Sequence, residues 1–270
     1  MDQRPIGVFD SGLGGLTALR ELRRILPGEE LVYFGDTGRV PYGTKGKETI
    51  LHYACQDVSF LRTFDPKAIV VACGTVSANA LEELQRENDL PIFAVVTPAA
   101  RAAVESTRNK RVGLIGTSAS IRSGAYEREM ARLDPGVRVT ARACPLFVPL
   151  VENGRFRPGD RVAELVVEEY LTPIKDAGVD TLVLGCTHYP LLMDTIRSFM
   201  GPNVTLIDTG AVCANHAADT LRERGLLAQR EKGSYRCFVS DSIEDFTHLA
   251  SIFLGEPLEG EVERVEIWRY

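Results

Sequence analysis

TLVLGCTHYPLL, residues 181–192, joins a strand signal to three chemically active side chains. The mainly apolar TLVL segment, with its β-branched residues, is typical of a buried strand that ends at Gly185. Cys186, Thr187 and His188 follow directly. Ligands of open α/β sheets bind at the carboxyl ends of the strands. The stretch therefore predicts a site where a thiol, a hydroxyl and an imidazole meet a small molecule.

A second stretch repeats this design. AIVVACGTVSA, residues 68–78, gives an apolar strand signal that is followed by Cys73, one residue and Thr75. The cysteines of the two stretches lie 113 residues apart (186 − 73), and the glycine-rich turn at Asp10 is matched by the turn at Gly116, an offset of 106 (116 − 10). Such similar offsets predict an internal duplication, so the chain carries two copies of a strand that ends in a thiol.

Strand and helix signals alternate along most of the chain. An apolar strand at residues 6–9 leads through a glycine-rich turn into a helix over residues 16–26, and similar units follow. Such alternation predicts an α/β fold with mainly parallel sheets. The duplication predicts two similar lobes related by a pseudo-twofold axis, with the active site in the cleft between them. The thiols of Cys73 and Cys186 would then lie on opposite walls of the cleft.

The composition favours a soluble globular protein with a substantial core. The 270 residues are 44% hydrophobic and 25% charged. A formal charge of −6 argues against nucleic acid or an anionic membrane as a partner. The start of the chain lacks the basic and apolar regions of a signal peptide, and no apolar run reaches the roughly 18 residues that span a bilayer. We therefore expect a cytoplasmic protein.

The six cysteines are expected to be free thiols, because a reducing cytosol does not favour disulfides. Four of them lack the spacing of zinc ligands and are interpreted as structural: Cys55, Cys144, Cys213 and Cys237. No metal site is expected.

Two thiols that face each other suit one reaction. One thiol removes a proton from one face of a carbon atom, and the other adds a proton to the opposite face. The thiol that takes the proton must be a thiolate, and since a free thiol has a pKa of about 8.5, its neighbours must favour the anion or accept its proton. Asp10 and His188 each follow a strand in a different half, where such neighbours would stand. Ser11, Thr75 and Thr187, with backbone N–H groups, are candidates to hold carboxylates.

Each feature also has a structural interpretation. A single cysteine is most often inert packing, and it is the repeated Cys-x-Thr at matched strand ends that favours reactive thiols. Asp10 and Ser11 are typical helix caps. Tyr42 and Gly43 are ordinary turn residues, except that the length of their loop is typical of functional loops. Glu152 is interpreted as a solvated side chain, with a place on the cleft wall as the alternative.

Six stretches together resemble the glutamate racemase family, in the family's order and over most of the chain up to about residue 210. They are FDSGLGGLT (9–17), YFGDTGRVPYGTK (33–45), VVACGTVSAN (70–79), RSGAYE (122–127), CPLFVPLVENG (144–154) and GCTHYPLL (185–192). The resemblance implies a cofactor-independent enzyme that interconverts L- and D-glutamate and supplies D-glutamate for bacterial peptidoglycan.

The resemblance also assigns roles to residues. It implies that Cys73 and Cys186 are catalytic, with Asp10 assisting the first thiol and His188 the second. It implies that Cys186 takes the α-proton of L-glutamate while Cys73 donates to the other face, and that the roles exchange for D-glutamate. The implied substrate contacts are Asp10, Ser11, Tyr42, Gly43, Thr75, Thr187 and His188.

Family membership would further imply that the C-terminal part completes one lobe. The first lobe would then comprise residues 1–98 and 208–270, the second residues 99–207, and the protein would form a homodimer. The chain departs from the family at Gly74, where asparagine is common, so any substrate contact there would come from the backbone amide. Thr97 stands where glutamate is frequent. These departures bear on substrate affinity more than on the reaction type.

Three other functions stay open. An aspartate racemase of the same superfamily is the nearest, although its second cysteine is typically followed by Thr-Glu, so His188 argues against it. A thiol hydrolase or transferase needs one nucleophilic cysteine, and the duplicated Cys-x-Thr speaks against that. A nonenzymatic dinucleotide or anion binder could use the turn at residues 12–15, but Thr17 occupies the third glycine position of the dinucleotide motif.

Overall fold

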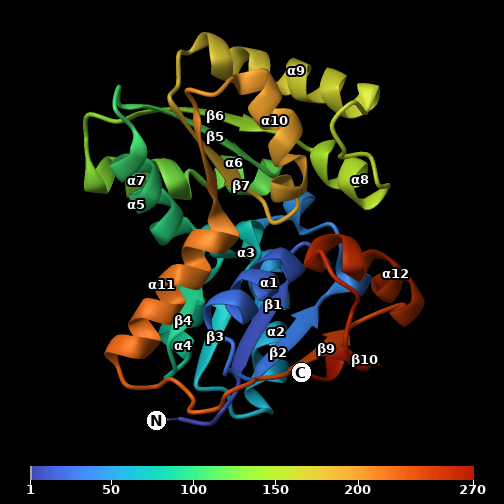
Figure 1. Cartoon of the computed structure of the whole chain (residues 1–270). Coiled ribbons are helices and arrows are strands. Elements are labelled where there is room, and N and C mark those ends of the chain that lie inside the picture. The colour runs from blue at the N-terminus through green and yellow to red at the C-terminus, as the bar shows by residue number, and fades with distance from the viewer. Residues whose placement is uncertain (1) are drawn as a thin grey trace.

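The computed structural model describes residues 2–270 and contains two parallel β-sheets with helices packed around them (Figure 1). The larger sheet has six strands in the order β10-β9-β2-β1-β3-β4, and the smaller has four in the order β6-β5-β7-β8. All neighbouring strands in both sheets pair in parallel. The predicted α/β class with parallel sheets is confirmed.

The strands and helices alternate along the chain. The strands are β1 (Ile6–Asp10), β2 (Leu31–Gly35), β3 (Ala68–Val71), β4 (Ile92–Ala94), β5 (Arg111–Gly116), β6 (Arg138–Ala143), β7 (Thr181–Gly185), β8 (Thr205–Asp208), β9 (Tyr235–Val239) and β10 (Val262–Arg264). The helices are α1 (Leu16–Ile25), α2 (Lys47–Arg62), α3 (Gly74–Asn79), α4 (Leu81–Glu87), α5 (Val96–Ser106), α6 (Ser118–Ser123), α7 (Ala125–Leu133), α8 (Phe147–Glu152), α9 (Arg161–Asp176), α10 (Met193–Met200), α11 (Thr209–Glu223) and α12 (Ile243–Leu254). Short 3₁₀ turns cover Thr37–Arg39, Tyr42–Thr44, Tyr189–Leu192 and Ile267–Arg269.

The internal duplication is visible in the order of the strands. The first half of the chain contributes β2-β1-β3-β4 to the larger sheet, and the second half builds β6-β5-β7-β8 in the same order. β1 pairs with β3, with Ile6 opposite Ala68, and β5 pairs with β7, with Val112 opposite Thr181. The two strands that end in a cysteine, β3 and β7, therefore hold equivalent places in the two sheets.

Burial explains why these segments are strands. Every residue of β1, β2, β3 and β7 is buried, as expected for parallel strands with helices on both faces, and their sequences are correspondingly apolar. β6 lies at the edge of its sheet and is only partly buried. Helix α1 is amphipathic, and its apolar side chains at Leu16, Leu19 and Leu22 are fully buried.

In three segments the structure departs from the sequence pattern, which predicts one helix over about residues 77–87, one helix over 123–133 and a long loop from Cys144 onward. The helix expected over residues 77–87 is two helices, α3 and α4, which meet at Ala80. The helix expected over 123–133 begins after Gly124, whose φ of 64° separates α6 from α7. The second long loop, expected from Cys144 onward, contains the short helix α8.

The two sheets draw on different parts of the chain. The six-stranded sheet takes its strands from residues 6–94 and 235–264, and the four-stranded sheet from residues 111–208. The finer division into lobes of residues 1–98 with 208–270, and of residues 99–207, stays a prediction. Helix α11 packs against both α1 and α5, so it links the two units (Figure 1). Among residues 2–270 we find no helix with the length and apolarity needed to cross a membrane.

Candidate active site

Both duplicated cysteines line one cavity at the carboxyl ends of β3 and β7. The cavity has a volume of about 340 Å³ and is bounded by residues from both sheet units. Its wall from the first unit includes Ser11, Gly12, Val40, Pro41, Tyr42, Gly43, Thr44, Cys73, Gly74 and Thr75. Its wall from the second unit includes Thr117, Ser118, Cys144, Pro145, Val148, Pro149, Glu152, Cys186, Thr187, His188 and Tyr189. The two thiols thus line the same cavity, one from each sheet unit.

Cys73 lies just beyond β3, at the start of α3, and is buried. Its thiol donates a hydrogen bond to Oγ of Ser11 over 3.5 Å. Burial, together with the negative charge of Asp10, raises the pKa of Cys73 to about 12, although the Ser11 hydroxyl opposes the rise. Cys73 is therefore a neutral thiol at neutral pH, which is the form that donates a proton.

Cys186 has a different environment. Its sulfur lies 3.9 Å from Nδ1 of His188, and Nε2 of His188 donates to Oε1 of Glu152 over 3.0 Å. Burial disfavours the charged imidazolium, but the interactions with Cys186 and Glu152 outweigh it and raise the pKa of His188 to about 10. The sulfur of Cys186 therefore lies beside an imidazole that favours its protonated form. The two thiols therefore differ, one held neutral and the other beside a cation.

Asp10 ends β1 and is almost completely buried. Its carboxylate accepts hydrogen bonds from the backbone N–H of Gly12 over 3.0 Å and from the Thr187 hydroxyl over 3.4 Å. Burial raises the pKa of Asp10, and the charge of His188 opposes the rise. Asp10 does not itself line the cavity, and it contacts the second unit through Thr187.

Tyr42 reaches the cavity from a 3₁₀ turn that is anchored by two buried carboxylates. Its hydroxyl donates to Asp36 and, over 3.2 Å, to Asp57. Arg39 bonds both carboxylates, at 2.5 Å from Asp36 and 2.9 Å from Asp57. Ser240, which follows β9, donates to Asp36 over 2.7 Å. This network holds the loop that carries Tyr42 and Gly43 against the carboxyl ends of β2 and β9.

Hydroxyl groups join the two units across the cavity. Thr75 and Thr117 lie 2.9 Å apart between their Oγ1 atoms, and Thr117 also contacts the buried Ser120 hydroxyl over 2.9 Å. Thr117 caps α6 through a hydrogen bond from the backbone of Ser120. The N-termini of α3 and α6 and the hydroxyl groups of Thr75 and Thr117 thus meet at one wall, and such donors suit a carboxylate.

The structure brings together most of the site residues expected from the sequence. Those that line the cavity are Ser11, Tyr42, Gly43, Cys73, Gly74, Thr75, Cys186, Thr187 and His188, while Asp10 lies behind it. The sequence reasoning missed Thr117 and interpreted Glu152 as solvated. Both lie on the cavity wall, which is the alternative that the sequence left open for Glu152. Thr117 directly follows the end of β5, which is the signal that could have identified it, and Glu152 is the last residue of α8.

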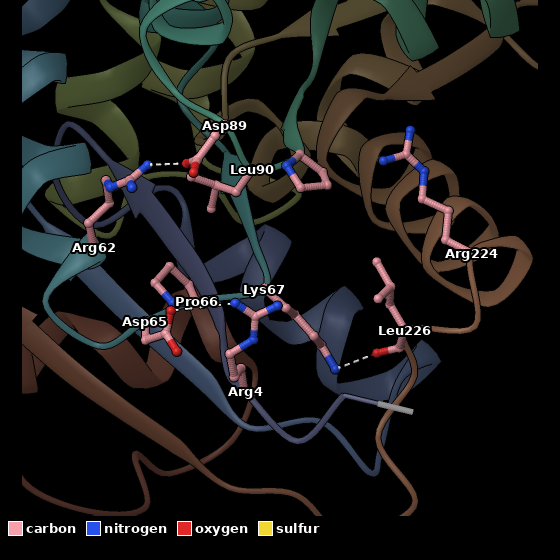
Figure 2. Close-up of a pocket in the computed structure, with 10 residues that line it drawn as sticks. Arg4, Arg62, Asp65, Pro66, Lys67, Asp89, Leu90, Arg224 and Leu226 are labelled. Atoms are coloured by element: carbon pink, nitrogen blue, oxygen red, sulfur yellow. Dashed lines mark hydrogen bonds and ion pairs between the residues drawn. The ribbon is translucent and has the colours of Figure 1, made fainter.

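A second cavity, of about 330 Å³, lies at the amino ends of β1, β3 and β4, away from the cysteines (Figure 2). Its cationic side chains are largely neutralised, since Arg62 pairs with Asp89 and Arg4 with Asp65. Lys67 donates to Glu29 and to two backbone carbonyl groups. Within residues 2–270 no group of three or more His, Cys, Asp and Glu side chains is arranged to hold a metal ion.

Comparison with known proteins gives a consistent result. The family model described as Asp/Glu/Hydantoin racemase matches residues 16–217. A glutamate racemase from Geobacter metallireducens is 48% identical over 268 residues, which are 99% of this chain and 98% of that protein.

Solved structures agree. The glutamate racemase from Francisella tularensis in complex with D-glutamate has a TM-score of 0.93 at 36% identity, with 100% of each chain covered. The Escherichia coli glutamate racemase in complex with L-glutamate and an activator has a TM-score of 0.77 at 27% identity, covering 97% of this chain and 98% of that one. Sequence and fold therefore agree that the chain belongs to the Asp/Glu/hydantoin racemase family, among its glutamate racemases.

Proposed function

We propose that this chain interconverts L- and D-glutamate through two cysteine bases, Cys73 and Cys186, that act on opposite faces of the α-carbon. The observation that carries the proposal is the pair of thiols from duplicated strands on the walls of one cavity. The different surroundings of the two thiols also support the proposal, because the reaction needs a base and an acid at the same time.

In the direction from L-glutamate, Cys186 acts as the base. The Cα–H bond breaks, its proton forms an S–H bond with the Cys186 thiolate, and the electron pair stays on the α-carbon. Cys73, which is a neutral thiol, then delivers its proton to the opposite face and becomes a thiolate. The product is D-glutamate. In this direction the residue assigned to assist Cys186 is His188, whose Nδ1 lies 3.9 Å from the sulfur.

In the direction from D-glutamate the roles exchange. Cys73 must first lose its proton, and its surroundings make this harder, since burial and the charge of Asp10 favour the thiol. The hydroxyl of Ser11, 3.5 Å away, is the neighbour that opposes this effect. Asp10, as a buried carboxyl group next to Ser11, is assigned the role of assisting Cys73, and His188 that of assisting Cys186.

The polar groups around the thiols are assigned to substrate binding. Ser11, Thr75 and Thr187 offer hydroxyl groups, and Gly43 and Gly74 offer backbone amides at the starts of a turn and a helix. Tyr42 forms part of the wall. Because the substrate carries two carboxylates, these donors orient it with the α-carbon between the sulfur atoms.

The relatives support glutamate as the substrate, because solved relatives hold D-glutamate in one case and L-glutamate in another. On this basis the protein supplies D-glutamate for peptidoglycan synthesis in the cytoplasm. The resemblance to the family further favours a homodimer, which sedimentation of the purified protein tests.

One assay tests the reaction. Purified protein without added cofactor is incubated with L-glutamate in deuterated water, and circular dichroism follows the loss of optical activity. We expect the signal to fall to zero and the D-glutamate formed to carry deuterium at the α-carbon. D-glutamate without the label, or faster conversion of L-aspartate than of L-glutamate, would contradict the proposal.

A further inference from the structure

The glycine-rich turn at residues 12–15 of the first unit contacts the residues that follow Cys186 in the second. A Cβ atom placed on Gly14 would lie 2.5 Å from Nδ1 and 2.7 Å from Cε1 of His188, and closer still to the hydroxyl oxygen of Thr187. Real Cβ atoms do not approach other atoms that closely. The bare backbone of Gly14 therefore lies against the imidazole and the hydroxyl group, in a space that has no room for a side chain.

Thr17 makes a second contact between the same segments. It lies in the first turn of α1, and its buried hydroxyl group donates to the carbonyl oxygen of Gly14 over 2.8 Å and to that of Thr187 over 3.2 Å. The hydroxyl group of Thr187 in turn donates to the carboxylate of Asp10 over 3.4 Å. A glycine at position 17, as in a dinucleotide-binding turn, could make neither of the Thr17 bonds. The start of α1 is thus bonded to the segment that carries His188.

The turn itself has no space into which it could retreat. A Cβ atom placed on Gly15 would collide with Asp10 of β1 and lie 3.1 Å from the hydroxyl oxygen of Tyr33. Tyr33 belongs to β2, is completely buried and donates to the carbonyl oxygen of Gly12 over 2.7 Å. The turn is therefore packed against β1 and β2 on one side and against the second unit on the other.

The imidazole of His188 has aromatic and polar neighbours besides the turn. Its ring is buried and packs edge-on against Phe253 of α12, with 5.2 Å between the ring centroids and 82° between the planes. Its Nε2 donates to Glu152 over 3.0 Å, and its Nδ1 faces the sulfur of Cys186 at 3.9 Å. An atom added at residue 14 displaces the ring from this arrangement, so at least one of the two polar contacts lengthens.

We propose, building on the two-base function, that Gly14 and Thr17 are positioning residues for the imidazole of His188. They hold the ring where Nδ1 faces Cys186 and Nε2 bonds Glu152. The first unit thereby orients a side chain that the second unit carries. Neither residue lines the cavity, so neither touches the substrate in this role. The glycine-rich turn then serves the contact between the two units rather than the binding of a nucleotide.

The protonation of the imidazole reports its position. The titratable groups that face His188 are the thiol of Cys186 and the carboxyl groups of Glu152 and Asp10. The interactions with Cys186 and Glu152 raise the pKa of His188 to about 10, although burial opposes the rise. A displaced ring loses part of these interactions while the site stays buried, so its pKa falls. The pKa of His188 is therefore a measure of its placement that does not depend on catalysis.

The test compares Gly14→Ala with the wild type by NMR titration of protein that is labelled with nitrogen-15 only in its histidines, with His188→Asn to assign the signal. We expect the pKa of His188 to be about 10 in the wild type and to fall by about one unit in Gly14→Ala. Racemisation of L-glutamate should fall by about 10- to 100-fold, because a displacement of about 1 Å has effects of that size. Thr17→Val, which keeps the size of the side chain, should lower the same pKa by about half a unit. Gly46→Ala is the matched control, since a Cβ atom there has no neighbour within 4 Å and φ is −78°.

The outcomes separate this inference from the function on which it rests. Wild-type protein that forms no deuterium-labelled D-glutamate in deuterated water would overturn the two-base function, whatever the titration shows. A His188 pKa near its ordinary value in the wild type, or one that is unchanged in a folded Gly14→Ala variant, would overturn only the positioning role. If Gly14→Ala lacks the native circular dichroism spectrum, Thr17→Val carries the test. An unchanged His188 pKa in Thr17→Val, or misfolding of both variants, would overturn the positioning role as well.

Discussion

Glu152 accepts a hydrogen bond from Nε2 of His188 over 3.0 Å, although 36 residues separate them in the sequence. The other ring nitrogen of His188 faces the sulfur of Cys186. One carboxylate on α8 therefore helps to stabilise positive charge on the imidazole that stands next to the Cys186 thiol. This arrangement links a residue at the rim of the cavity to the proton chemistry.

Replacing Glu152 with glutamine is expected to change the pH dependence of the reaction. The carboxylate helps to raise the pKa of His188 to about 10, so the imidazolium is lost only as the pH rises towards that value. In Glu152→Gln we expect the alkaline limb of kcat/KM for L-glutamate to move to lower pH by about one unit. Glu169→Gln, at an exposed position of α9, is the control. An alkaline limb that stays in place would show that Glu152 does not support the charge on His188.

Each thiol is expected to be indispensable. A serine hydroxyl is far less acidic than a thiol, so Cys73→Ser and Cys186→Ser should each lower racemisation in both directions by about 10³-fold or more. Steady-state circular dichroism with L- and D-glutamate measures the effect. Cys55→Ser serves as the control, because Cys55 lies on α2 and does not line the cavity. Normal rates in either of the first two variants would exclude the two-base scheme.

Arg39 is expected to be important for stability as well as for the Tyr42 loop. Its guanidinium group is the cation that bonds Asp36 and Asp57, and both carboxylates are completely buried. Arg39→Ala should reduce the free energy of unfolding by about 3–5 kcal/mol, because the buried side chains of Asp36 and Asp57 lose the cation that pairs with both of them. Arg39→Lys should retain only part of this stability, since an ammonium group cannot bond both carboxyl groups with the planar geometry of a guanidinium group.

Urea unfolding measures the effect at Arg39. Arg132→Ala removes an exposed ion pair with Glu129 and should leave the unfolding midpoint close to that of the wild type. An Arg39→Ala midpoint equal to that of Arg132→Ala would mean that the carboxylates find other partners.

Lys67 is expected to stabilise the amino ends of the strands of the larger sheet, away from the cavity that holds the two cysteines. Its ammonium group is buried and lies 2.5 Å from Oε2 of Glu29, with further bonds to the carbonyl oxygens of Asp2 and Leu226. Lys67→Met should cost about 3–5 kcal/mol of unfolding free energy, since it strands the Glu29 carboxylate. The double variant Lys67→Met/Glu29→Gln should recover part of that loss. In folded protein, kcat should remain unchanged. A large fall in kcat at low temperature, where the variant is folded, would show that Lys67 affects the reaction as well as stability.

Local patterns predicted the elements that position the thiols. The apolar runs before Cys73 and Cys186 are β3 and β7, and the similar offsets along the chain correspond to the repeated strand order. These features could be predicted because a parallel strand that is buried on both faces has a continuous run of apolar residues. The fold class follows from the same signal.

Features that depend on tertiary contacts could not be predicted in this way. Glu152 looks like any surface carboxylate until α8 brings it to His188, and α12 left no expectation at all. The contact between Thr75 and Thr117 depends on how the two units meet, which no local pattern encodes. Helix breaks such as that at Ala80 likewise reflect packing more than intrinsic propensity.

The pairing of β9 with β2 has a consequence for biosynthesis. Leu31 lies opposite Tyr235, which follows it by 204 residues (235 − 31). On the ribosome, β2 emerges long before β9, so the edge of β2 that pairs with β9 stays open while residues 111–208 are translated. Such late closure lengthens the time during which that edge is available to other chains. The time for which this strand edge stays open is thus set by the order in which the strands emerge.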